Sequence, residues 1–165
     1  DLLTSRGLGD VYKRQDIYSG GSNPAINYLA AIGNTLYFRA DDGVHGDELW
    51  KSDGTAAGTV MVKDIRSGSF GSYSVELTTV GNILFFRADD GVHGDELWKS
   101  DGTTAGTVMV KDIDTGLDNS YPRELTAFDT DGDGESDALY FKAQVQADGE
   151  ELWMSDGTSA GTVMV

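Results

Sequence analysis

The stretch ELWKSDGT at residues 48–55 decides the fold of this chain, because it recurs as ELWKSDGT at residues 96–103 and as ELWMSDGT at residues 151–158. The step from the second copy to the third is longer than the step from the first to the second. Repetition at a period of a few tens of residues is typical of architectures in which each unit buries its apolar surface by stacking on its neighbours. The chain is therefore predicted to be a tandem array of one structural unit.

The array is expected to begin near residue 16, because Asp16-Ile17 precedes the first phrase by the same distance as Asp64-Ile65 precedes the second. Residues 1–15 match nothing in the units. They resemble a peptide translated from a sequencing-adapter junction, so a non-native or disordered leader is expected there. The last unit stops at Val-Met-Val, where both earlier copies continue into Lys-Asp-Ile, which indicates an array truncated at its C-terminus. The expected units are about 16–63, 64–111 and 112–165.

Composition restricts the classes of partner. The 165 residues carry a formal net charge of −16, which disfavours nucleic acid and anionic membrane surfaces as partners. No apolar run is long enough to cross a membrane, so membrane insertion is not expected. The chain contains no cysteine, which excludes disulfides and thiolate metal sites and leaves the cellular compartment open.

The second unit reads as four short strands and no helix. Residues 83–88 are aromatic and branched and lie between two turn sequences, which is typical of a strand. Segments 95–99 and 107–113 predict a hairpin, and 76–80 supplies the fourth strand. Four antiparallel strands in about 48 residues match one blade of a β-propeller. An all-β fragment of about three blades is predicted, with a β-solenoid-like array as the alternative.

The repeated phrase, followed each time by Ala-Gly-Thr at 57–59, 105–107 and 160–162, resembles the bacterial ELWxxDGT-repeat family. The resemblance covers residues 16–165. It implies large exported or cell-surface proteins that form propeller-like β-repeats, and it implies no defined catalytic activity.

Residues that are identical in all three units are interpreted as scaffold. The Trp is expected to be a buried anchor, the Glu before it a buried carboxylate that accepts backbone hydrogen bonds, and Asp-Gly a tight turn. A sugar-stacking Trp and a catalytic Glu are the alternatives. A recurring Glu fits an asymmetric active site poorly, so no catalytic residue is assigned. These positions are Glu48, Trp50, Asp53, Gly54, Glu96, Trp98, Asp101, Gly102, Glu151, Trp153, Asp156 and Gly157.

The extra length of the third unit lies in an acidic loop, DTDGDGESD at 129–137. Carboxylates at its first, third, fifth and ninth places and Gly at its sixth are typical of a Ca²⁺ loop. Tyr140 stands where an EF-hand has Glu, and both flanks read as strand. The loop instead resembles the calcium loops in hairpins of FG-GAP and integrin-type propellers. An acidic solvated turn is the alternative. The predicted ligands are Asp129, Asp131, Asp133, Asp137 and the main-chain oxygen of Glu135.

His45 and His93 each follow two aspartates in equivalent loops, where a transition-metal site is one interpretation. The third unit replaces this loop with residues 144–149, which lack both His and the Asp pair. An exposed acidic loop is therefore the preferred interpretation.

The favoured function is a non-catalytic, calcium-stabilised module of a secreted or cell-surface protein, for adhesion or for binding protein or glycan. Tyr28, Tyr73 and Tyr121 lie in the segments that differ most between units and are the candidate contacts, with plain inter-blade connections as the alternative. Two further readings are part of a propeller enzyme acting on glycans and a structural spacer that displays another domain. Further repeat units of a parent chain are expected.

Overall fold

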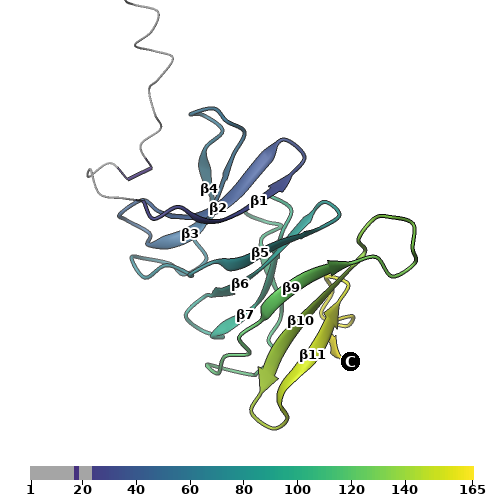
Figure 1. Cartoon of the computed structure of the whole chain (residues 1–165). Coiled ribbons are helices and arrows are strands. Elements are labelled where there is room, and N and C mark those ends of the chain that lie inside the picture. The colour runs from purple at the N-terminus through teal and green to yellow at the C-terminus, as the bar shows by residue number, and fades with distance from the viewer. Residues whose placement is uncertain (1–16, 19–23) are drawn as a thin grey trace, which may run out of the picture.

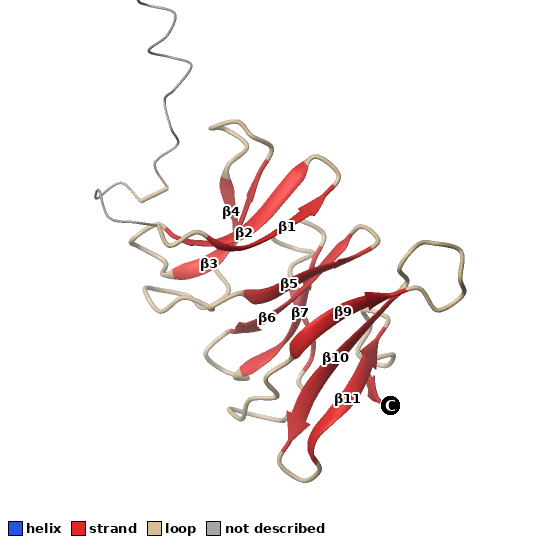
Figure 2. Ribbon diagram, in the orientation of Figure 1, coloured by secondary structure: helices blue, strands red, loops and turns tan. Residues whose placement is uncertain are grey.

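The computed structural model describes residues 17–18 and 24–165, and every regular element in these residues is a β-strand. The leader expected at residues 1–15 lies outside the described residues. Twelve strands form three four-stranded antiparallel sheets, each built from strands that are consecutive in the chain. The predicted all-β fold of four-stranded antiparallel units is confirmed (Figure 2).

The sheets are called blades 1, 2 and 3. Blade 1 contains β1 (Asn27–Ile32), β2 (Thr35–Asp41), β3 (Asp47–Ser52) and β4 (Val60–Lys63). Blade 2 contains β5 (Val75–Val80), β6 (Ile83–Asp89), β7 (Asp95–Ser100) and β8 (Val108–Lys111). Blade 3 contains β9 (Arg123–Phe128), β10 (Ala138–Val145), β11 (Gly149–Ser155) and β12 (Val163–Met164).

The three blades follow one another as propeller-like units. The first strands lie side by side, because β5 contacts both β1 and β9, as Figure 1 shows. Each unit completes its own sheet before the chain passes to the next one. In a β-solenoid, by contrast, a sheet is assembled from strands of successive coils. The sheet topology therefore favours blades over the solenoid-like alternative.

The core lies between the sheets. In the first interface, Tyr37 and Leu49 of blade 1 pack in one buried cluster with Phe86 and Trp98 of blade 2. The second interface repeats this arrangement with residues of blades 2 and 3, among them Phe85, Leu97, Phe141 and Trp153. A blade covered on both faces needs apolar residues on both sides of its strands, which explains runs such as Leu-Phe-Phe in β6.

The strand predicted over 107–113 is shorter in the structure. β8 ends at Lys111 because the backbone N–H of Ile113 donates to the carboxylate of Glu96, at 2.9 Å, in place of a neighbouring strand. The first strand of each blade also contains a bulge that the sequence did not indicate. The left-handed residues there are Tyr28, Glu76 and Glu124, with φ of 53°, 60° and 55°.

Candidate metal centre

The acidic loop connects β9 to β10 at the tip of a hairpin in blade 3. It begins directly after Phe128 and ends at Asp137, whose N–H donates to the carbonyl oxygen of Phe128 at 3.1 Å. Gly132 and Gly134 have φ of 80° and 94°, and this left-handed conformation bends the loop back on itself. The acidic loop therefore lies between two strands of one blade, as the sequence predicted.

Three carboxylates converge inside this loop. Asp129, Asp131 and Asp133 each present one oxygen, and these oxygens lie within 4.8 Å of one another. The group can hold a metal ion. The donors are all oxygens, which suits a hard cation such as Ca²⁺ or Mg²⁺ better than a metal that prefers nitrogen or sulfur.

Backbone amides orient these carboxylates. Asp129 accepts hydrogen bonds from the N–H groups of Gly134 at 2.8 Å and of Gly132 at 2.6 Å, which lower the pKa of Asp129. The carboxylate of Asp131 accepts from the N–H of Asp133 at 3.1 Å, and that of Asp133 accepts from the N–H of Glu135 at 2.8 Å. The loop thus holds its carboxylates in place through its own main chain.

Asp137 has a different position from the other three aspartates. Its two carboxylate oxygens accept from the N–H of Thr130 at 3.0 Å and from the Thr130 hydroxyl at 2.7 Å. These bonds fasten the end of the loop to its beginning. The structure therefore brings together three of the five predicted ligands, while Asp137 closes the loop and Glu135 contributes its N–H to Asp133.

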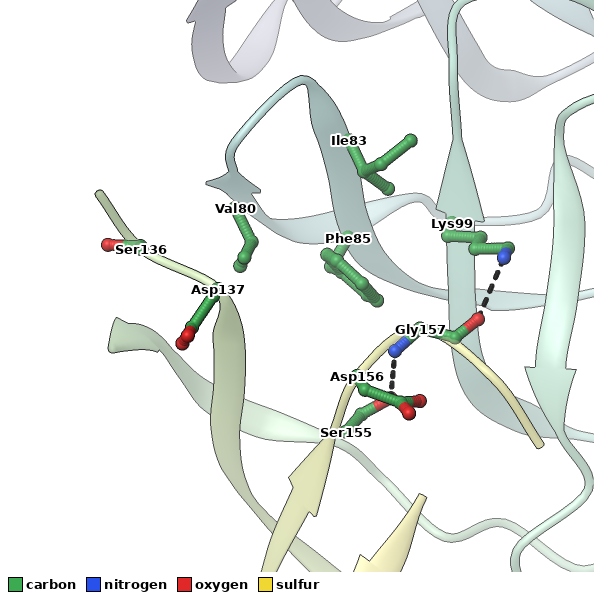
Figure 3. A pocket seen from close by; sticks show the side chains of 9 residues that line it. All are labelled: Val80, Ile83, Phe85, Lys99, Ser136, Asp137, Ser155, Asp156 and Gly157. Carbon is green, nitrogen blue, oxygen red and sulfur yellow. Dashed lines mark hydrogen bonds between the residues drawn. The ribbon is translucent and has the colours of Figure 1, made fainter. Parts of the chain in front are cut away.

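The end of the acidic loop also lines a pocket between blades 2 and 3. Ser136 and Asp137 face Val80 and Ile83 of blade 2 across a cavity of about 200 Å³ (Figure 3). Lys99 lies on the far side, where its Nζ donates to the carbonyl oxygen of Gly157 at 2.7 Å. The acidic loop is therefore part of a blade interface as well as of a hairpin.

An equivalent pocket of about 480 Å³ lies between blades 1 and 2. There Lys51 donates from Nζ to the carbonyl oxygen of Gly102 at 2.7 Å, so the same lysine contact occurs in both interfaces. The sequence did not indicate this contact. The equivalence of the two lysines in the repeat was visible, but their partners lie 51 and 58 residues away along the chain.

Glu48 is completely buried and accepts four hydrogen bonds. The donors are the N–H groups of Ile65 and Arg66, both at 3.2 Å, and the N–H and hydroxyl of Ser72, at 2.9 and 2.7 Å. Burial raises the pKa of Glu48 to about 7. All the donors belong to the connection from β4 to β5, so this carboxylate holds the link between two blades.

Glu96 is buried in the same way, and burial raises its pKa to about 7 as well. Its carboxylate accepts from the N–H groups of Ile113 and Asp114 and from the N–H and hydroxyl of Ser120. Glu151, in contrast, is exposed.

The repeated tryptophans are all buried: Trp98 and Trp153 lie between the sheets, and Trp50 packs against Phe38 and Ala40 of blade 1. Lys63 of blade 1 places its Nζ 5.7 Å from the ring centroid of Trp98, and Lys111 of blade 2 lies at the same distance from Trp153. A sugar-stacking platform needs an exposed ring face, so this burial favours the interpretation as an anchor.

Each Asp-Gly pair forms a tight turn. In the first turn, Asp53 accepts from the N–H and hydroxyl of Thr55 at 2.9 and 2.7 Å, and Gly54 has a φ of 87°. The turns at Asp101 and Asp156 have the same hydrogen bonds. Packing between blades also requires glycine at position 102, because a Cβ there would lie 2.2 Å from the Tyr37 hydroxyl.

The two histidines pair with aspartates in their own loops. His45 Nδ1 lies 2.7 Å from a carboxylate oxygen of Asp42, and His93 Nδ1 lies 2.8 Å from one of Asp90. These hydrogen bonds raise the pKa of each imidazole. In the part of the chain that the structure describes, no group of three metal ligands gathers around either histidine.

The three candidate tyrosines do not occupy equivalent positions. Tyr28, Tyr73 and Tyr121 are all exposed and have left-handed backbone conformations. Tyr73 and Tyr121 stand at the same place in their units, two residues before β5 and β9 begin, whereas Tyr28 lies in the bulge of β1, in the place of Glu76. Its ring packs under the Arg39 guanidinium, at 4.9 Å from the ring centroid. Only Tyr73 and Tyr121 therefore form a repeated pair.

No protein-family model and no curated protein matches the chain. Among solved structures it is similar to the computationally designed Ika4 protein, with a TM-score of 0.46, 18% identity, and coverage of 91% of this chain and 78% of that one. It is also similar to the computationally designed Ika8 protein, with a TM-score of 0.43, 18% identity, and coverage of 81% of this chain and 34% of that one. The chain thus spans about a third of the Ika8 chain. Among the described residues, there is no helix with the length and apolar character of a membrane span.

Proposed function

We propose that this chain is a calcium-stabilised module of a non-catalytic secreted or cell-surface protein, which binds protein or glycan through its inter-blade loops. The observation that carries the proposal is the convergence of Asp129, Asp131 and Asp133 in the β9–β10 hairpin. The bacterial ELWxxDGT resemblance of residues 48–55 and their repeats supports an exported repeat protein.

Calcium fits this loop better than magnesium. Ca²⁺ accepts six to eight oxygen ligands in flexible geometry, whereas Mg²⁺ demands a near-octahedral shell and keeps several waters. The loop DTDGDGESD, rich in acidic residues, offers many oxygens from its side chains and its main chain. Asp129, Asp131 and Asp133 would hold the ion, with Glu135 and Asp137 adding a main-chain and a side-chain oxygen. Bound calcium would neutralise the mutual repulsion of these carboxylates.

The same chemistry supports a location outside the cell. Extracellular calcium modules bind with dissociation constants of about 10⁻⁴ to 10⁻³ M, which suit an exposed loop whose carboxylates are already held by backbone amides. Such a site would be filled where calcium is plentiful. Its role would be to order the hairpin and the pocket wall formed by Ser136 and Asp137.

The burial of the repeated glutamates supports a binding role over a catalytic one. Glu48 and Glu96 are enclosed and hydrogen-bonded to the connections between blades, so neither carboxylate can reach a substrate. Three exposed aromatic side chains, Phe70, Tyr73 and Tyr121, lie in the connections where blades are joined. Exposed aromatic side chains on loops held by a rigid scaffold are typical of recognition surfaces.

The test compares binding with turnover. Glycan and protein arrays probed with the chain in calcium should give binders that Tyr73→Ala and Tyr121→Ala weaken together. Val92→Ala, in an exposed loop of blade 2, is the matched control and should leave binding unchanged. Incubation of the same glycans with the chain should release no product. Cleavage of a bound glycan would contradict the proposal.

A further inference from the structure

The pocket between blades 1 and 2 differs from the equivalent pocket between blades 2 and 3. Its volume of about 480 Å³ lies in the range of about 300 to 1,000 Å³ that is typical of small-molecule sites, whereas the other pocket measures about 200 Å³. Tyr37 lines the larger pocket, and Phe85 stands at the same place in the smaller one (Figure 3). The larger pocket therefore has both the room for a ligand and an additional polar group.

The hydroxyl of Tyr37 is a buried polar group that no protein group binds. Tyr37 is 5% exposed, and its ring packs in the buried cluster between blades 1 and 2. Its hydroxyl reaches the turn of blade 2, since a Cβ at Gly102 would collide with it. Within the described residues, nothing donates a hydrogen bond to this hydroxyl or accepts one from it. A buried tyrosine hydroxyl usually has a partner, so this one is available to a ligand in the pocket.

A lysine beside this hydroxyl supplies further donors. Lys51 lines the same pocket and uses one of its three N–H bonds on the carbonyl oxygen of Gly102, at 2.7 Å. Two N–H bonds of the ammonium remain for a ligand. Burial, and then the charge of Asp101, raise the pKa of Tyr37, so the tyrosine keeps its proton and can donate as well.

Two carboxylates in the pocket supply acceptors. Asp53 and Asp101 line opposite turns of the pocket, one from each blade. The Oδ1 atom of each accepts from a threonine of its own turn, Thr55 at 2.9 and 2.7 Å and Thr103 at 2.8 and 2.7 Å. These bonds fix the orientation of both carboxylates and leave each Oδ2 as an acceptor for a ligand.

This set of groups suits a neutral ligand with several hydroxyl groups. A hydroxyl both donates and accepts, so adjacent hydroxyls on one ring can bind a carboxylate and an ammonium at the same time. An anion would be repelled by Asp53 and Asp101, and a cation would be repelled by Lys51. Ala57 and Val60 add apolar surface to the pocket, which matches the C–H groups of a sugar ring.

The pocket is separate from the surface that contains Tyr73 and Tyr121. The N–H of Tyr73 donates to the carbonyl oxygen of Asp47, the first residue of β3, at 3.1 Å. Asp53, in contrast, directly follows Ser52, the last residue of β3. The pocket therefore lies at the opposite end of the blades from these two tyrosines.

We propose that the pocket between blades 1 and 2 binds one neutral sugar residue. Tyr37 and Lys51 donate to oxygen atoms of the sugar, and Asp53 and Asp101 accept from its hydroxyl groups. The pocket between blades 2 and 3 is not expected to bind the same sugar, because Phe85 has no hydroxyl and the cavity is smaller. This site is additional to the loop surface of the proposed function and does not depend on it.

The test is an NMR titration of the chain, in calcium, with labelled tyrosine rings. The probes are glucose, galactose, mannose, fucose and N-acetylglucosamine, each added alone. At least one of them should shift the signal of Tyr37, which is assigned by its disappearance in Tyr37→Phe. The signals of Tyr73 and Tyr121 should stay in place. Glycine, methylammonium and inorganic phosphate are the charged comparison probes and should leave Tyr37 unshifted.

Calorimetry of the sugar that binds measures the role of the hydroxyl. Tyr37→Phe copies the residue of blade 2, keeps the buried ring and removes one hydrogen bond, so it should weaken binding by about threefold to tenfold with an unchanged melting temperature. Tyr140→Phe removes the hydroxyl from the equivalent residue of blade 3, which does not line this pocket. This matched control should bind as the wild type does.

Three results would overturn the proposal. They are a Tyr37 signal that no sugar shifts, a Tyr37 signal that glycine or methylammonium shifts and sugars do not, and equal affinities of the wild type and Tyr37→Phe. A sugar that shifts Tyr73 or Tyr121 but not Tyr37 would also overturn it, while leaving the proposed function of the loop surface in place. Shifts of Tyr37 without any effect of Tyr73→Ala on array binding would do the reverse.

Discussion

Lys51 of blade 1 donates a hydrogen bond from its Nζ to the carbonyl oxygen of Gly102 in blade 2, at 2.7 Å. The same repeated phrase therefore supplies the donor in one blade and the acceptor in the next. Lys51→Met copies the residue found in blade 3 and should lower the free energy of unfolding by about 1 to 2 kcal/mol, since a charged hydrogen bond to a backbone carbonyl is lost. Urea unfolding measures the change.

The control for this substitution is Lys142→Met. Lys142 pairs with Glu124 on the surface of blade 3, at 2.8 Å, and both side chains are exposed. An exposed ion pair contributes about 0 to 1 kcal/mol, so this variant should lose less stability than Lys51→Met. Equal losses in the two variants would show that the contact between blades adds nothing.

Glu48 should be among the most sensitive positions of the fold. Glu48→Ala leaves the N–H groups of Ile65, Arg66 and Ser72 without their acceptor, and the expected loss is about 3 to 5 kcal/mol. Glu151→Ala is the matched control, because this glutamate stands at the same place in the repeat but is exposed. In urea unfolding, Glu151→Ala should lower the free energy of unfolding by no more than about 0.5 kcal/mol. A mild effect of Glu48→Ala would contradict the role assigned to this carboxylate.

The buried glutamates also predict a pH dependence of stability. Burial raises the pKa of Glu48 and of Glu96 from 4.5 to about 7, so the folded chain binds protons more tightly than the unfolded chain at these two sites. Their contribution to stability is complete below pH 4.5 and is lost as the pH rises through about 7. The variant with both Glu48→Gln and Glu96→Gln should therefore lose less stability than the wild type between these pH values.

Urea unfolding of both proteins across this pH range measures the difference. The raised pKa values of His45 and His93 come mainly from their hydrogen bonds to Asp42 and Asp90, which both proteins keep, so most of the histidine effect cancels in the comparison. The aspartates with lowered pKa values act at lower pH, where their contribution is lost as the pH falls. Parallel pH profiles for wild type and double variant would rule out a titration of the buried glutamates in this range.

Two equivalent glycines separate backbone strain from packing between blades. Gly54 and Gly102 have φ of 87° and 85°, so alanine is strained at both, by about 1 kcal/mol. Gly102→Ala should cost a further 1 to 3 kcal/mol or so, because its Cβ meets the Tyr37 hydroxyl while that of Gly54 meets nothing. Thermal melting of the two variants gives the comparison, and equal losses would mean that the turn does not press on the preceding blade.

Much of the fold could be predicted from the repeat. The regular recurrence of the ELW phrase and the turn sequences around 83–88 placed β6 of blade 2 to within one residue. The tertiary contacts could not be predicted, because they join residues that lie far apart in the chain. Ser72 and Ser120 stand at the same place in two successive units, which was visible, but nothing local shows that each hydroxyl binds a buried glutamate.

The candidate metal loop was the part of the site most readable from sequence. The alternation of Asp129, Asp131 and Asp133 with glycine depends on local chain geometry alone, and the structure brings these three carboxylates together. Asp137 shows the limit of that reasoning. Its spacing fits a ninth-place ligand, but in the structure both of its oxygens accept hydrogen bonds from Thr130.

Calcium binding by this loop is tested most directly by thermal melting of the chain in calcium and in chelator. A ligand that binds only the folded state at about 100 times its dissociation constant adds about 2.7 kcal/mol of stability. The melting temperature should therefore rise in calcium for the wild type and for Asp148→Ala, which removes an exposed aspartate of the β10–β11 turn. Asp131→Ala should abolish the rise, and equal melting curves of the wild type in calcium and in chelator would contradict the account.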